Sequence, residues 1–99
     1  MEKKVFILRY DWAINGESGF DNIAVYSNKE SACQELQSFV ADKKKTILAD
    51  FFSNGELVNT NEVENYECGD DYFVFTTLCG EYVIKVYIDT FDVINDNTY

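Results

Sequence analysis

Residues 27–40 read SNKESACQELQSFV, and this segment decides the fold that we predict. Ser27 and Glu30 form a capping box, in which the serine hydroxyl accepts from the third helical amide and the glutamate reaches back. Apolar residues then recur at steps of three and four, which places them in one stripe along a helix. The stripe consists of Ala32, Cys33, Leu36, Phe39 and Val40. We expect it to pack on a sheet as part of the core.

The sequence beyond this segment allows two interpretations. Ile47 and Phe51 fall where the stripe would continue, so the favoured prediction is a helix that runs into the low fifties and has Gly55 as its C-cap. The alternative ends the helix near Lys45 and makes residues 46–52 a strand, which turns at the Asn-Gly pair that follows.

Two strands are expected before the helix, over residues 3–14 and Phe20–Tyr26, joined by a glycine-containing loop at 15–19. The first strand is apolar on both faces at its beginning, which favours a central place in the sheet. One face holds Phe6, Leu8, Tyr10, Trp12 and Ile14, and the other begins with Val5 and Ile7.

The clearest hairpin pairs Tyr72–Leu78 with Tyr82–Asp89 around a turn at Cys79-Gly80. In this register Phe73 opposes Val86, Phe75 opposes Ile84, Tyr72 opposes Tyr87, Val74 opposes Lys85 and Thr76 opposes Val83. The face that includes Phe73, Phe75, Ile84, Val86 and Ile88 is expected to meet the helix. Residues 56–71 are predicted as a polar, irregular connection, and residues 91–94 as an extension of the last strand.

The sum is an α+β domain of order ββαββ, with an antiparallel sheet of about four strands and one long helix packed on one face. Its 99 residues are expected to form a single domain, residues 1–99, in which 95–99 are frayed. The 46% apolar and 16% aromatic content excludes intrinsic disorder. The apolar run near the N-terminus is too short for a signal peptide or a membrane span, so a cytoplasmic protein is expected.

The negative charge is concentrated in one part of the chain. The net charge is −10, yet residues 1–45 hold as many acidic as basic side chains. The whole excess therefore lies after Lys45, where Lys85 is the one base. Direct binding of nucleic acid or of an anionic membrane is disfavoured, because such partners need basic patches.

Catalytic and metal chemistry find little support in the sequence. Histidine is absent, which excludes Ser-His and Cys-His nucleophile systems. The carboxylate pairs Asp70/Asp71 and Asp89/Asp92 lack a pattern that would make them converge. Residues 59–71 and 92–97 are rich in oxygen ligands but do not match a calcium-binding loop. Three widely spaced cysteines make neither a disulfide scaffold nor a zinc site, and no cofactor is expected.

Two groups of residues are candidates for binding a partner. Five acidic residues occur without a base among them: Glu62, Glu64, Glu67, Asp70 and Asp71. Such carboxylates can imitate backbone phosphates and steer association with a basic protein, although plain solubility explains them equally simply. The second group is aromatic or apolar and consists of Tyr66, Tyr72, Val74, Val83 and Tyr87. If the helix covers one side of the sheet, the last four are left on the other, unless residues 56–66 or the C-terminal segment cover them.

The sequence thus predicts a non-enzymatic, acidic protein-binding module. Its concrete form is an inhibitor that docks on the basic groove of a nucleic-acid-handling protein. The alternative is a homodimeric structural domain without a dedicated ligand, held together by the uncovered sheet face. A metal-dependent enzyme or a calcium-binding domain comes third.

Overall fold

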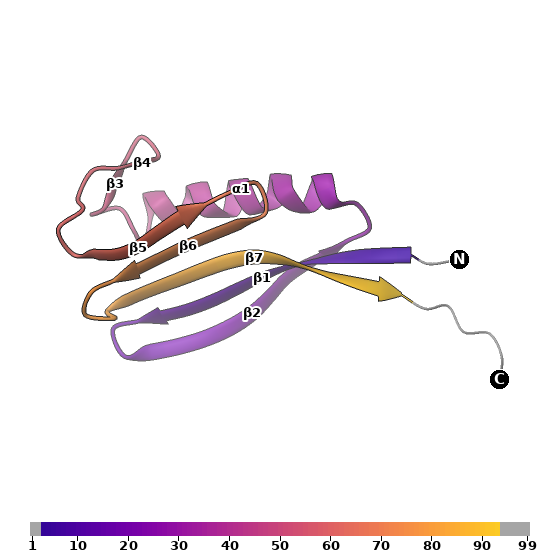
Figure 1. Ribbon diagram of the computed structural model, residues 1–99, viewed down its shortest axis with the longest axis horizontal. Coiled ribbons are helices and arrows are strands. Elements are labelled where there is room, and N and C mark those ends of the chain that lie inside the picture. Colours follow the sequence, from indigo (N-terminus) through magenta and orange to yellow (C-terminus); the bar gives the residue numbers. More distant parts are fainter. Residues whose placement is uncertain (1–2, 94–99) are drawn as a thin grey trace.

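The structure, a computed structural model, describes residues 3–93 and has one helix against a five-stranded antiparallel sheet (Figure 1). The strands of this sheet lie in the order β2-β1-β7-β6-β5, and β3 and β4 form a separate small hairpin. The elements are β1 (Lys3–Ile14), β2 (Glu17–Tyr26), α1 (Lys29–Lys45), β3 (Phe52–Ser53), β4 (Glu56–Leu57), β5 (Val63–Cys68), β6 (Tyr72–Thr77) and β7 (Tyr82–Val93). The α+β class with one helix on one face of an antiparallel sheet is confirmed. The predicted order ββαββ and the count of about four strands match only roughly, because the main sheet has five strands and β3 and β4 form a second sheet.

The first hairpin is close to its prediction. β1 has the predicted bounds and lies between β2 and β7, which confirms its central place. The turn uses only Asn15 and Gly16, whose φ angles are 52° and 88°. Two residues with positive φ match the right-handed twist of the flanking strands, so β2 begins at Glu17 rather than at Phe20.

The helix begins one residue later than the capping box predicted. Asn28 is the N-cap, and its side-chain oxygen accepts a hydrogen bond from the Ser31 amide at 3.2 Å. Asparagine and serine cap helices about equally well, so sequence gives little ground to choose between neighbours of these two types. The predicted stripe is confirmed: Ala32, Leu36 and Val40 are buried, and Cys33 and Phe39 are half-buried.

The favoured prediction of a helix reaching the low fifties is wrong. The helix ends at Lys45, where the Thr46 amide and hydroxyl both donate to the Asp42 carbonyl, at 3.0 and 2.8 Å. On a continued helix Leu48 would point roughly 120° and Phe52 roughly 160° away from the centre of the apolar stripe. The turn that follows Lys45 instead buries Leu48 and leads into β3, where Phe52 is buried, so the chain gains more apolar contact by leaving the helix.

The alternative prediction is correct about the turn but not about the strand length. Asn54 and Gly55, with φ angles of 54° and 81°, connect β3 to β4. The strand before them is only Phe52–Ser53 rather than residues 46–52.

The predicted irregular connection over residues 56–71 contains an edge strand of the main sheet, β5. Its partner is β6, and the register shifts between Val63 and Asn65. Because of this bulge, the apolar residues Val63 and Tyr66 both face the helix side although they are three positions apart in the sequence, and not two. The alternation of apolar and polar residues that indicates a strand is therefore broken, so the sequence pattern did not predict β5.

The β6–β7 hairpin confirms the predicted register at all five pairs. β7 continues to Val93, so the predicted extension holds up to that residue. Ile94 and the predicted fraying of residues 95–99 lie outside the described part of the chain.

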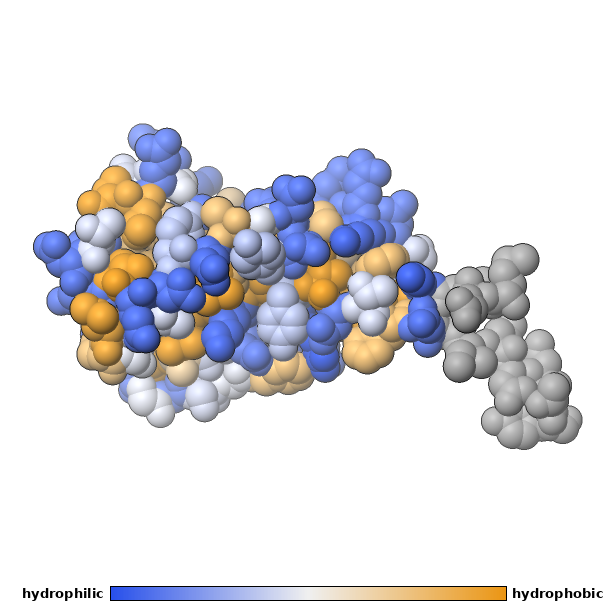
Figure 2. Space-filling view, in the orientation of Figure 1, coloured by the Kyte–Doolittle hydropathy of each residue, from blue (hydrophilic) through white to orange (hydrophobic). Residues whose placement is uncertain are grey.

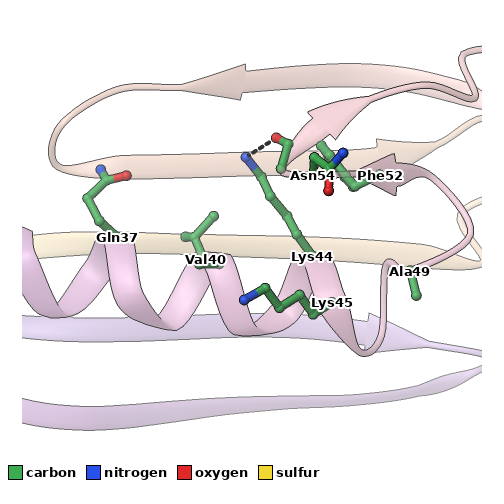
Figure 3. A pocket seen from close by; sticks show the side chains of 9 residues that line it. Gln37, Val40, Lys44, Lys45, Ala49, Phe52 and Asn54 are labelled. Atoms are coloured by element: carbon green, nitrogen blue, oxygen red, sulfur yellow. Dashed lines mark hydrogen bonds between the residues drawn. The ribbon is translucent and has the colours of Figure 1, made fainter.

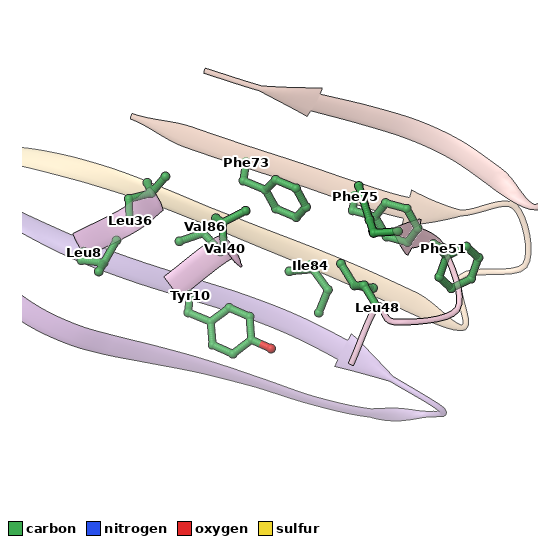
Figure 4. Packing of buried hydrophobic residues seen from close by; sticks show 11 residues of the cluster. Leu8, Tyr10, Leu36, Val40, Leu48, Phe51, Phe73, Phe75, Ile84 and Val86 are labelled. Atoms are coloured by element: carbon green, nitrogen blue, oxygen red, sulfur yellow. The ribbon is translucent and has the colours of Figure 1, made fainter. Parts of the chain in front are cut away.

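The core lies between α1 and the sheet (Figure 4). Leu36 and Val40 of the helix lie over Leu8 and Tyr10 of β1, and over the side chains that β6 and β7 contribute. Of the predicted helix-facing residues, Phe73, Phe75, Ile84 and Val86 are fully buried and Ile88 is partly buried. Leu48, Phe51 and Phe52 close the core at the C-terminal end of the helix.

Candidate functional site

The five predicted acidic residues lie along one border of the sheet, which we call the acidic edge: Glu62, Glu64, Glu67, Asp70 and Asp71. Glu64 occupies the bulge of β5, Glu67 pairs with Val74 of β6, and the two aspartates lie in the turn to β6. A six-residue strand spans about 20 Å, so the carboxylates are spread out rather than gathered around one point. Such an arrangement forms a stripe of charge and not a cluster that could hold an ion.

Only the end of the acidic edge is neutralised by a nearby base. Lys29 Nζ lies 3.6 Å from an oxygen of Asp71. The side chain of Gln37 donates to the carbonyl oxygens of Gly69 and Asp70, at 3.0 and 3.2 Å, and so fastens the turn to the helix. Within residues 3–93 the other four carboxylates of the edge have no ion-pair partner.

The acidic edge also has a structural use. β5 is an edge strand, whose outward N–H and C=O groups could pair with a strand of another chain. Charged side chains and a bulge are the usual means of preventing such pairing. Glu64 provides both at one position.

The structure separates the two tyrosines that were predicted to act together. Tyr66 lies on the helix side, where its ring is 5.4 Å from that of Phe52 and 5.8 Å from that of Phe73. Burial and the neighbouring Cys68 raise the pKa of the Tyr66 hydroxyl to about 12. Tyr72 pairs with Tyr87 on the opposite side of the sheet. Tyr66 therefore belongs to the border of the core and shares no surface with Tyr72.

The other four predicted residues, Tyr72, Val74, Val83 and Tyr87, lie together on the face of the sheet that the helix leaves uncovered. We call this the outer face. Further apolar residues join them there by the strand registers: Val5, Ile7, Phe20, Val25 and Phe91. Phe20, Val25, Tyr72 and Phe91 are 41–62% exposed. Residues 56–66 do not cover this face, because they form the hairpin by the helix end and the sheet edge (Figure 1).

A network of charges crosses the outer face, and it was not among the predictions made from the sequence. The Arg9 guanidinium forms an ion pair with Asp89, and its Nε donates to Asn22 at 3.0 Å. The same guanidinium lies 4.9 Å from the ring centre of Phe20 and 5.9 Å from that of Phe91, which are favourable cation–π distances. Figure 2 shows hydrophobic and hydrophilic residues interspersed on the face in view.

Tyr87 and Asp11 extend this network. The Tyr87 hydroxyl donates to Asp11 Oδ2 at 3.3 Å. Burial raises the pKa of the tyrosine, and the charge of Asp11 adds to the effect. A signal for the network was present in the strand alternation, because Arg9 and Asp11 share the face of Val5 and Ile7.

Two hollows lie on the helix side of the molecule. One, of about 520 Å³, lies between the end of α1 and the β3–β4 hairpin (Figure 3). Two lysines, Lys44 and Lys45, line this hollow. Lys44 Nζ donates to the Gly55 carbonyl at 3.0 Å and lies 5.0 Å from the ring centre of Phe52. A second hollow, of about 620 Å³, includes Cys33 and the paired Lys29 and Asp71.

The two carboxylate pairs considered for catalysis are placed differently: Asp70 and Asp71 line the same hollow, whereas Asp89 and Asp92 lie on opposite sides of the sheet. Asp71 pairs with Lys29, and Asp89 pairs with Arg9 on the outer face. Asp92 opposes Lys4 of β1 and lies on the other side of the sheet from Asp89. Across the described residues there is no group of three or more side chains placed to hold a metal ion. Residues 59–71 contain β5 rather than a ligand loop, and most of 92–97 lies outside the described range.

Neither a protein-family model, nor a curated protein, nor a solved structure matches this chain. In the part of the chain that the structure describes, no helix is long and apolar enough to cross a membrane. The acidic edge and the outer face are the two candidate functional surfaces.

Proposed function

We propose that this chain is a non-enzymatic protein-binding module that uses its acidic edge to dock on a protein with a basic surface. The observation that carries the proposal is the spacing of the carboxylates along the free border of the sheet. Glu62, Glu64, Glu67 and Asp70 extend over about 20 Å, and no base within residues 3–93 pairs with them. A line of uncompensated charge attracts a basic partner and speeds its association.

The concrete form of the proposal is an inhibitor that occupies a groove built for nucleic acid. Strand geometry supports it, because carboxylates on an extended chain recur at intervals of several ångströms, on the scale of backbone phosphates. The turn that holds Asp70 is fixed to the helix by Gln37, so this end of the stripe is preorganised. Preorganisation lowers the entropy cost of binding.

The test compares two variants with the same change in charge. One carries Glu62→Gln, Glu64→Gln and Glu67→Gln on the acidic edge. The control carries Glu30→Gln, Glu35→Gln and Asp42→Asn, three exposed positions on the helix. Each protein is immobilised and exposed to a lysate at low and at high salt, with and without added nucleic acid, and the retained proteins are identified by mass spectrometry.

The proposal predicts a basic, nucleic-acid-handling protein that the unmodified chain and the helix control retain at low salt. High salt and added nucleic acid should both release it, and the edge variant should fail to retain it. Equal retention by all three proteins would contradict a docking role for the edge. In that case the carboxylates serve solubility and protection of the edge strand.

A further inference from the structure

We propose that the outer face of the sheet binds the outer face of a second copy of this chain. The dimer would be a sandwich of two sheets with a helix on each outside. Sheets that pack face to face align within about 30° and lie about 10 Å apart. This proposal does not rest on the acidic edge, which lies at the border of the face.

The charge on the outer face is what selects a second copy as its occupant. The chain carries a net charge of −10, so two copies repel each other wherever the acidic part of the chain after Lys45 is brought together. On β1, β2, β6 and β7, however, the charged side chains of the outer face among residues 4–92 are two bases and two acids: Arg9, Lys85, Asp11 and Asp89. The charges of these four strands balance, and Glu67 of β5, which pairs with Val74, lies at the border. The balance lets two such acidic chains approach through this face.

The pairing of these charges also suits an interface. Arg9 and Asp89 neutralise each other within one chain, and they are only 24% and 33% exposed. Lys85 is exposed and forms no ion pair with another described residue, although Asp11 is its register neighbour on β1. In a twofold dimer each contact between different residues of the two copies occurs twice, with the roles of the copies exchanged. Lys85 of each copy can then lie against Asp11 of the other.

The size and composition of the face fit a stable dimer. β1 and β7 have 12 residues each, and with strands about 4.8 Å apart the four strands β2, β1, β7 and β6 present on the order of 600 Å² per copy. A standard interface buries about 800 Å² per partner. Phe20, Tyr72 and Phe91 are exposed aromatic residues on this face, and aromatic residues are enriched at interfaces.

The test exchanges the charges in separate chains. In a homodimer of Lys85→Glu, the acid introduced at position 85 faces Asp11 of the other copy. In a homodimer of Asp11→Lys, the base introduced at position 11 faces Lys85 of the other copy. A mixture of the two variants restores opposite charges, but only across the interface between different chains. Sedimentation velocity over a concentration series gives the dimer dissociation constant, and native mass spectrometry identifies which chains pair. Lys45→Glu and Glu56→Lys, both exposed on the helix side, are the matched controls.

The unmodified chain and both controls should dimerise. Each outer-face variant should dissociate at least about tenfold more readily, and the mixture should form a one-to-one heterodimer. A chain that is monomeric at every concentration overturns the proposal, and so does a mixture that forms no heterodimer. Should Asp11→Lys fail to fold, Val25→Lys tests the same face, because this valine is 62% exposed and a lysine there disturbs little but an interface.

The two proposals can fail separately. The glutamines on the acidic edge should leave the sedimentation of the chain unchanged, whereas Lys85→Glu should leave retention of the basic partner unchanged.

Discussion

The ammonium group of Lys44 donates a hydrogen bond to the carbonyl oxygen of Gly55 at 3.0 Å. It also lies 5.0 Å from the ring centre of Phe52 and 5.7 Å from that of Phe73. One side chain of the last helical turn thus holds the β3–β4 hairpin against the core. Its aliphatic stem gives the same residue apolar contact with the rings.

Replacing Lys44 by methionine should therefore loosen this hairpin. The variant keeps the length of the side chain but loses the hydrogen bond and the cation–π contact, so we expect a loss of about 1 kcal/mol in the free energy of unfolding. Urea denaturation measures it. Lys45→Met is the control, because Lys45 is exposed, and it should change the stability by less than about 0.5 kcal/mol. Equal effects at the two positions would show that the contact adds no stability.

Leu48 tests where the helix ends. Its side chain is fully buried because the chain turns after Lys45, whereas a continued helix would point it away from the apolar stripe. Leu48→Ala should cost about 2–5 kcal/mol of stability, as for other buried leucines. Leu78→Ala, at a position that is 65% exposed, should have little effect. If Leu48→Ala were as stable as the unmodified chain, the result would support a helix that continues beyond Lys45.

Gly19 tests the packing at the end of the first hairpin. It pairs with Trp12, and a Cβ atom at this position would lie 2.5 Å from two atoms of the indole ring. Gly19→Ala should displace the ring and destabilise the protein by about 1–3 kcal/mol. Trp12 is the only tryptophan, so a change in its fluorescence reports the displacement directly. Ser18→Ala, at the exposed neighbouring residue, should leave both the emission and the stability unchanged.

Tyr66 should make the protein sensitive to alkali. Its pKa rises from 10.0 to about 12 in the folded protein, so the folded state holds the proton more tightly than the unfolded state. The stabilisation is complete below pH 10 and is lost as the pH rises from about 10 to 12. Tyr66→Phe removes this group and should make the stability fall less steeply over that interval. Thermal unfolding across the pH series measures the difference, and parallel curves would assign the alkaline loss to other groups.

Local sequence patterns determined much of the fold. The stripe from Ala32 to Val40 specified the helix and its buried face, because a period of 3.6 residues needs no information from elsewhere in the chain. The alternation in β1, β6 and β7 specified which residues face that helix. The turn at Cys79-Gly80 then set the β6–β7 register, because a tight turn leaves little freedom to the strands that it joins.

Tertiary structure alone decided the end of the helix, the existence of β5 and the pairing of charges across the outer face. The chain leaves the helix after Lys45 because Leu48 and Phe52 find more apolar contact in a turn, and that contact is made with distant strands. β5 was hidden by its bulge, and Tyr66 is held to the core side by Phe52 and Phe73. Arg9 and Asp89 are 80 positions apart and meet only because β1 pairs with β7. Side-chain period is a local property of the chain, whereas strand order and the partners of a charge depend on which segments lie side by side.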